Sequence, residues 1–170
     1  TVARRARVPQ GGRVRSILGA DQQVKSIFGV DPGLHVGLLC VPLSTFRVEM
    51  LTLPPVEAAY WVEDRLEPGD VLATERFTAS AGSARYTRQN DALEVVGMMR
   101  LLAHKYAATF VLQTVSDAVK VAPADVIKAL GWWRRGDPDH VRRAAAQAAY
   151  ALFRLRPEEF ENRTRPGVVM

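Results

Sequence analysis

Acidic residues stand at three points of this sequence where their carboxylates could bind a divalent metal ion. Asp31 ends the apolar run 27–30, and Glu75 ends a second run of apolar or small residues at 71–74. A charge at the end of a buried strand is costly unless a cation or hydrogen-bond donors compensate it. Asp139 belongs to a third acidic group, at the start of an alanine-rich stretch. Three such carboxylates suit Mg²⁺, which takes oxygen ligands, and two such ions would activate a water and stabilise the leaving oxygen of a phosphodiester.

Each of these residues also has a structural interpretation that involves no metal. Asp31 could begin an Asp-Pro-Gly turn, and Glu75 could form an ion pair with Arg76. Asp137 is a suitable N-cap for the alanine-rich helix, with a proline at the first helical position. Asp139 would then complement the helix dipole. Taken together, the three positions favour a metal site in which Asp31, Glu75 and Asp139 are the ligands.

Apolar runs and turn signals predict the elements that would position these carboxylates. Two strands within 24–41 are predicted to flank the Asp31-Pro32-Gly33 turn. The remaining predicted elements are a strand at 45–53, a helix at 56–66, a strand at 71–75, a helix at 88–106, a strand at 110–113, a helix at 123–130 and a helix at 139–155. This order predicts an α/β fold with a five-stranded mixed sheet and helices on both faces. Ligand sites in such sheets lie at the C-terminal ends of the central strands, where Asp31 and Glu75 fall.

The composition indicates one globular domain with an anionic partner. A chain of 170 residues can build a single sizeable core. Lys and Arg total 23 against 18 Asp and Glu, and the sequence pI is about 9.8, so counterion release would favour binding to phosphates. We expect a flexible basic arm at 1–23, a folded domain at 24–157 and a loose charged tail at 158–170. The arm could contact nucleic acid or be a solvated tail.

Several other chemistries are disfavoured by the sequence. Cys40 is the only cysteine, which excludes an internal disulfide and a cysteine zinc cluster and fits a reducing cytosol. His35, His104 and His140 are scattered, so a tetrahedral zinc site has too few ligands. The chain has no Walker-type glycine loop and no apolar segment long enough to cross a membrane.

Five segments, taken in order, resemble the motifs of the RuvC-type Holliday junction resolvases. They are 28–37 around Asp31-Pro32-Gly33, 73–77 around Glu75, the helix start at 92–97, the segment 121–128, and Asp139-His140 with the alanine-rich helix that follows. The resemblance covers about residues 25–155 and implies a ribonuclease H-like nuclease domain at 24–157. It also implies a homodimer that uses Mg²⁺ or Mn²⁺, as two ions, to nick four-way and other branched DNA in recombination and repair. The catalytic residues that it implies are Asp31, Glu75, Asp139 and His140.

The chain departs from the family pattern at two points. The segment before the last acidic motif is shorter than in the bacterial resolvases, which suggests a compact phage-type relative acting in the cytoplasm of a bacterial host. Arg143 stands where the family has an aspartate, three residues after the histidine. We expect its guanidinium to lie on nearly the same helix face as Asp139, to repel a second metal ion and to hold the scissile phosphate.

Basic and aromatic residues close to the acidic positions are candidates for DNA contacts, with solvated surface charge as the alternative. One of the neighbouring tryptophans, Trp132 or Trp133, is expected to pack in the core. The expected DNA-binding residues are Arg76, Phe77, Arg85, Tyr86, Arg88, Lys128, Arg134, Arg135 and Arg143.

Three functions are compatible with these observations. The first is a structure-selective endonuclease for four-way and other branched DNA. The second is a related nuclease that acts on RNA. The third is a nucleic-acid-binding module with weakened catalysis, which Arg143 favours because it replaces a carboxylate.

Overall fold

The structure is a computed structural model that describes residues 24–77 and 88–165. The predicted basic arm at 1–23 lies outside the described residues. The candidate DNA contacts Arg85 and Tyr86 also lie outside them, as does the side chain of Arg88.

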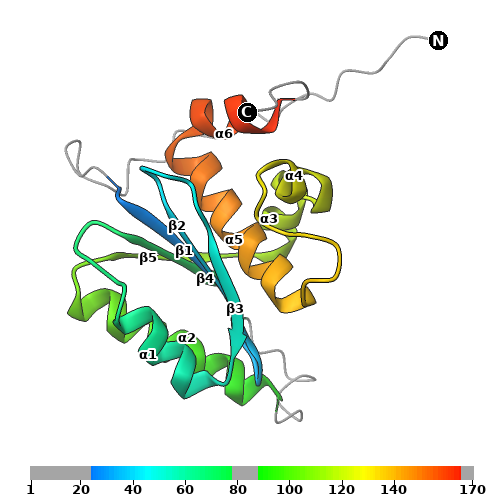
Figure 1. Ribbon diagram of the computed structural model, residues 1–170. Helices are drawn as coiled ribbons and strands as arrows, with labels where there is room; N and C mark the ends of the chain where they lie inside the picture. The colour runs from blue at the N-terminus through cyan, green and yellow to red at the C-terminus, as the bar shows by residue number, and fades with distance from the viewer. Residues whose placement is uncertain (1–23, 78–87, 166–170) are drawn as a thin grey trace.

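The core of the fold is one mixed sheet of five strands, as predicted (Figure 1). The strands are β1 (Ser26–Asp31), β2 (Val36–Pro42), β3 (Glu49–Leu53), β4 (Val71–Glu75) and β5 (Thr109–Gln113), in the order β3-β2-β1-β4-β5. The first three strands form an antiparallel meander, and β4 and β5 run parallel to β1. Because β1 and β4 lie inside the sheet with helices over both faces, nearly all their residues are buried, which explains their continuous apolar runs.

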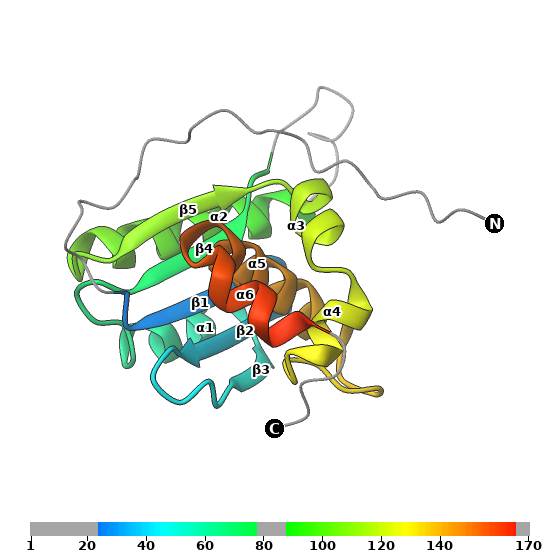
Figure 2. The same cartoon turned by 90° about the horizontal axis from the view of Figure 1, so that it is seen from above.

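Helices cover both faces of the sheet, which also agrees with the prediction. One face carries α1 (Pro55–Glu63) and α2 (Arg88–Lys105), whose apolar side chains pack with Phe28, Val30 and Leu72. The other face carries α5 (Asp139–Leu155), as Figures 1 and 2 show. Packed against α5 are α3 (Val115–Val121), α4 (Ala124–Ala129) and α6 (Pro157–Thr164). The described residues contain no helix long and apolar enough to span a membrane.

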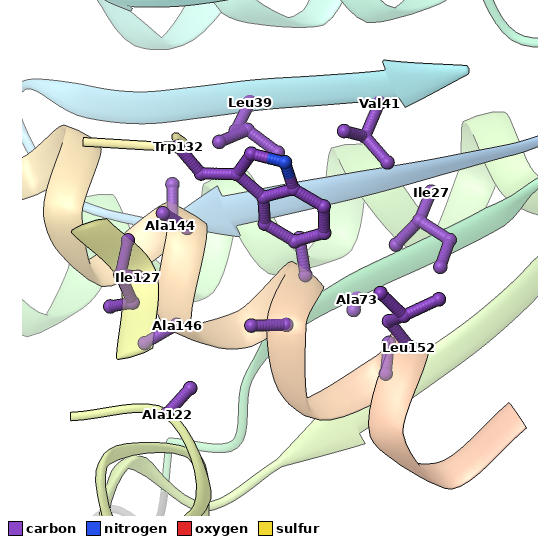
Figure 3. Packing of buried hydrophobic residues seen from close by; sticks show 14 of the residues in the cluster. Ile27, Leu39, Val41, Ala73, Ala122, Ile127, Trp132, Ala144, Ala146 and Leu152 are labelled. Atoms are coloured by element: carbon purple, nitrogen blue, oxygen red, sulfur yellow. The ribbon is translucent and has the colours of Figure 1, made fainter. Parts of the chain in front are cut away.

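Helix α5 approaches the sheet closely because both surfaces carry small residues. Its sheet-facing positions are mostly alanines. Glycines lie beneath them: a Cβ added at Gly29 of β1 would collide with the backbone oxygen of Ala144, and one at Gly37 of β2 with that of His140. Trp132 is buried in the same core, among side chains of β1, β2 and α5 (Figure 3), which confirms that one tryptophan packs inside.

Some boundaries differ from the predictions, for local reasons. Strand β3 begins at Glu49 rather than at residue 45, because the chain first makes a turn in which Phe46 has a φ of 54°. Helix α1 begins one residue early, at Pro55, and ends at Glu63 rather than at residue 66.

Two short helices were not predicted. Helix α3 begins after Thr114, whose hydroxyl accepts a hydrogen bond from the Asp117 N–H. Helix α6 occupies 157–164, where a loose tail was expected. It is anchored by Phe160, which is buried with its ring edge-on to Phe153 at a centroid distance of 5.4 Å.

Candidate active site

Asp31 and Glu75 are neighbours at the carboxyl edge of the sheet. Each is the last residue of its strand, and the parallel register of β1 and β4 pairs Val30 with Thr74, the residues just before them. Alternate residues of a strand share a face, so both carboxylates lie on the side covered by α5, as do Ile27 and Val71. The sheet therefore brings together two of the three predicted ligands.

His140 is delivered to Asp31 by the first turn of α5. Gly37 is the register partner of Asp31 on β2, and its lack of a side chain lets the backbone of His140 lie directly over it. The His140 Nδ1 then lies 2.7 Å from Oδ2 of Asp31. With an ionised aspartate, the Nδ1–H donates this bond and leaves Nε2 as an acceptor. The structure thus brings His140 into direct contact with Asp31, and its catalytic role stays a prediction.

Burial raises the pKa of both carboxylates, and the charge of Asp31 acts on Glu75 as well. Burial raises the pKa of Asp31, while the hydrogen bond from His140 and the charge of Arg143 act in the opposite direction. Burial, together with the negative charge of Asp31, raises the pKa of Glu75 to about 7, against a smaller lowering by Arg143. A pair of partly buried carboxylates with this behaviour gains from a cation placed between them.

Asp139 makes its described hydrogen bonds with two arginines. It is exposed, its Oδ1 accepts a hydrogen bond of 2.8 Å from Nε of Arg142, and its Oδ2 accepts one of 3.1 Å from Nε of Arg143. These contacts, that of Arg142 above all, lower the pKa of Asp139. Across the two described ranges, no three His, Cys, Asp or Glu side chains are grouped so that they could hold a metal ion. The role of Asp139 as third ligand stays a prediction.

The prediction of Asp137 as the N-cap of α5 is wrong. Pro138, not Asp137, is the N-cap residue, and it makes no side-chain capping bond. The carboxylate of Asp137 instead accepts a hydrogen bond of 2.7 Å from the Arg134 N–H and so closes the loop before the helix. A short local turn satisfies this carboxylate better than the helix end does.

A divalent ion fits the Asp31 and Glu75 pair. Mg²⁺ is commonly bound through one or two carboxylates, with water and substrate phosphate completing its octahedron. The pair supplies hard oxygen donors at neighbouring strand ends. Within the described residues no group of three His, Cys, Asp or Glu ligands is assembled, so water and substrate phosphate would have to complete the shell of an ion held by this pair.

The described candidate DNA contacts lie on several elements, and their role in DNA binding stays a prediction. Arg76 is exposed and Phe77 is half-buried, directly after Glu75. Lys128 has its Nζ 4.9 Å from the ring centroid of Trp133. Arg134 and Arg135 are exposed on the loop that leads into α5, and Arg143 is exposed on the second turn of that helix.

Gln113 was not anticipated as a site residue. It ends β5 in register with Glu75, it is 3% exposed, and within the described structure neither of its side-chain polar atoms has a hydrogen-bond partner. The sequence held one signal of it, because Gln113 ends an apolar run just as Asp31 and Glu75 do. A neutral amide there gave no reason to infer chemistry.

No family model and no curated protein matches this sequence. Solved structures do. RuvC of Thermus thermophilus in complex with a Holliday junction substrate aligns with a TM-score of 0.62 and 16% identity, over 78% of this chain and 96% of that one. A second structure of Thermus thermophilus RuvC aligns over the same shares of the two chains with a TM-score of 0.54 and 16% identity. Neither is a phage protein, so the interpretation as a phage-type relative gains no support. The fold of this chain is the ribonuclease H-like fold of RuvC.

Proposed function

We propose that this protein is a structure-selective endonuclease that nicks four-way and other branched DNA by metal-assisted hydrolysis of phosphodiesters. The observation that carries the proposal is the pair of neighbouring carboxylates, Asp31 and Glu75, at the carboxyl edge of a RuvC-like sheet. Both have pKa values raised by burial. A purely structural pair of acids would be kept apart or matched with donors.

Each residue of the site has its own role in the proposed reaction. Asp31 and Glu75 would hold Mg²⁺ or Mn²⁺, which when bound supplies a Lewis acid and an activated water. His140 is oriented by its Nδ1–H bond to Asp31, so that its Nε2 can accept a proton from the attacking water. The net charge of +5 favours a polyanionic substrate.

We extend the proposal to a homodimer. Two nicks placed symmetrically in a four-way junction require two sites related by a two-fold axis. Light scattering of the protein alone and with junction DNA measures this directly. A monomer under both conditions would contradict the dimer without contradicting the nuclease.

The test of function is a cleavage assay on four labelled substrates: a four-way junction, a flap, a linear duplex and an RNA–DNA hybrid. Each is incubated with Mg²⁺, Mn²⁺ or EDTA. We expect metal-dependent nicks in the junction and the flap and none in EDTA. Asp31→Asn should abolish the nicks, whereas Glu57→Gln, an exposed residue of α1 on the opposite face of the sheet, should retain them.

A second function is favoured by one specific observation. Arg143 replaces a carboxylate of the family pattern, and the described residues group no three metal ligands. A nucleic-acid-binding module with weakened catalysis would show these features. It would bind the junction in the same assay and leave every substrate uncut with either metal, whereas cleavage of the hybrid alone would indicate an RNA-directed nuclease.

A further inference from the structure

The second turn of α5 carries a positive charge, Arg143, that is paired with a carboxylate of the first turn. Arg143 is held by the Asp139 carboxylate one turn earlier, at 3.1 Å from Nε, and the same carboxylate also binds Arg142. A single exposed ion pair constrains a side chain weakly, but two arginines on one carboxylate form a network. This network therefore restricts the orientation of the Arg143 side chain.

Helix geometry places this charge beside the two catalytic carboxylates. His140, three residues before Arg143, contacts Asp31 directly, and residues three apart lie on the same helix face. Glu75 ends the strand next to that of Asp31, so Arg143 is on the side of α5 that meets both strand ends. No hydrogen bond joins it to either carboxylate within the described structure.

The charges around the site suit one divalent ion better than two. Three carboxylates are present, those of Asp31, Glu75 and Asp139, and Asp139 is already neutralised by two arginines. Two metal ions in a nuclease lie about 3.5–4 Å apart and share carboxylate ligands, which requires more acidic groups than the two that remain. A guanidinium next to the pair would also repel a second divalent cation.

We infer that the site binds a single divalent ion, held by Asp31 and Glu75, and that Arg143 replaces the second ion by binding the scissile phosphate directly. This inference rests on the proposed function and specifies how that site recognises its phosphodiester. A guanidinium is suited to the task, because its planar N–H groups bind two phosphate oxygens at once. Asp139 is then the residue that positions Arg143.

The first experiment counts metal ions without measuring cleavage. Mn²⁺ is titrated into the protein and followed by electron paramagnetic resonance. We expect one magnetically isolated Mn²⁺ per protomer in the wild type and a coupled pair in Arg143→Asp, which restores a carboxylate and removes the cation. Arg154→Ala, at the far end of the same helix, removes one positive charge away from the site and should keep the single ion.

The outcomes separate this inference from the proposed function. A coupled pair in the wild type, or a single ion in Arg143→Asp, overturns the inference and leaves the nuclease proposal standing. Equal Mn²⁺ binding by the wild type and Asp31→Asn would overturn both, because the ion would then lie elsewhere.

A second experiment tests the phosphate contact with no metal present. Junction binding is measured in EDTA at several salt concentrations for the wild type, Arg143→Ala and Arg154→Ala. Loss of one phosphate contact should reduce the slope of log K against log salt by about 0.9 for Arg143→Ala. A slope equal to that of Arg154→Ala would assign Arg143 to solvent and overturn its role.

Discussion

Two aspartates are buried to nearly the same extent in this protein, Asp31 at 4% exposed and Asp70 at 1%, and they are held in different ways. Asp70 precedes β4, and its oxygens accept backbone N–H bonds from Ser26 at 2.9 Å and Glu67 at 2.8 Å. Asp31 lies at the opposite edge, bonded through a single oxygen to His140 and facing Glu75.

On this difference rests the proposal that Asp70 has a structural role and Asp31 a catalytic one. Burial raises the pKa of both residues. At Asp70, however, two backbone donors offset that cost and tie the loop before β4 to the start of β1. At Asp31 the hydrogen bond comes from the side chain of His140, and Glu75 ends the neighbouring parallel strand. This juxtaposition of two strand-end acids is the reason for proposing Asp31, and not Asp70, as a metal ligand.

The largest expected effect is a loss of cleavage when either proposed metal ligand is replaced. We expect Asp31→Asn and Glu75→Gln each to reduce the rate of junction cleavage by about 10³-fold or more, because several kcal/mol of transition-state stabilisation by the ion would be lost. Junction binding should change little, since the shape of the surface is kept. Single-turnover cleavage and a gel-shift assay measure the two effects, and wild-type turnover in either variant would contradict the metal site.

At Asp70 the expected loss is in stability. Asp70→Ala leaves the buried N–H groups of Ser26 and Glu67 without acceptors and should lower the free energy of unfolding by about 2 kcal/mol or more. Urea denaturation measures this. The rate of cleavage per folded molecule should stay at the wild-type level. If Asp70→Ala lost cleavage without losing stability, Asp70 could not be assigned a purely structural role.

Asp137 and Asp139, near the start of α5, test the same distinction between structural and catalytic roles outside the buried core. Asp139→Asn should slow cleavage by about tenfold, roughly 1.4 kcal/mol, because Arg143 loses its charged partner. Asp137→Ala should instead cost about 0.5–1 kcal/mol of stability, since it removes the bond from the Arg134 N–H. If the Asp137 variant is the inactive one, the role given to Asp139 belongs to its neighbour.

The smallest expected effect is a dependence of stability on pH, which arises from Glu75. Its pKa is about 7 in the folded protein and is ordinarily near 4.5, so between these values the folded state binds more protons than the unfolded one. Stability in EDTA should therefore fall as the pH rises through this window, by an amount reduced by the partial exposure of Glu75. Glu75→Gln should remove this part of the fall in thermal melts, and an unchanged profile would show that Glu75 titrates normally.

The sequence was sufficient for features that depend on local pattern. The five strands and the strand-end positions of Asp31 and Glu75 followed from apolar runs and from the turn that comes after β1. The buried tryptophan followed from its size. Strand β3 was predicted too long, because its period-two pattern begins before the turn at Phe46 has ended.

Features that depend on tertiary contact were harder to predict. The close fit of α5 to Gly29 and Gly37 is a property of two surfaces, and neither glycine carries a signal of it in its own segment. The binding of Asp139 by two arginines follows helical spacing, but its position relative to Asp31 and Glu75 depends on where the helix lies. Gln113 enters the site only through the register of β5.

The contact between His140 and Asp31 joins residues 109 positions apart. Asp31 lies on the first strand and His140 on a helix that is translated long after it, so Asp31 and Glu75 leave the ribosome before His140 and Arg143. Contacts of such sequence separation require a long loop to close before they stabilise the chain. Until α5 docks on its two glycines, a nascent chain can present Asp31 and Glu75 but cannot complete the site. A chain that lacked α5 would therefore lack the proposed site as well, even with all five strands present.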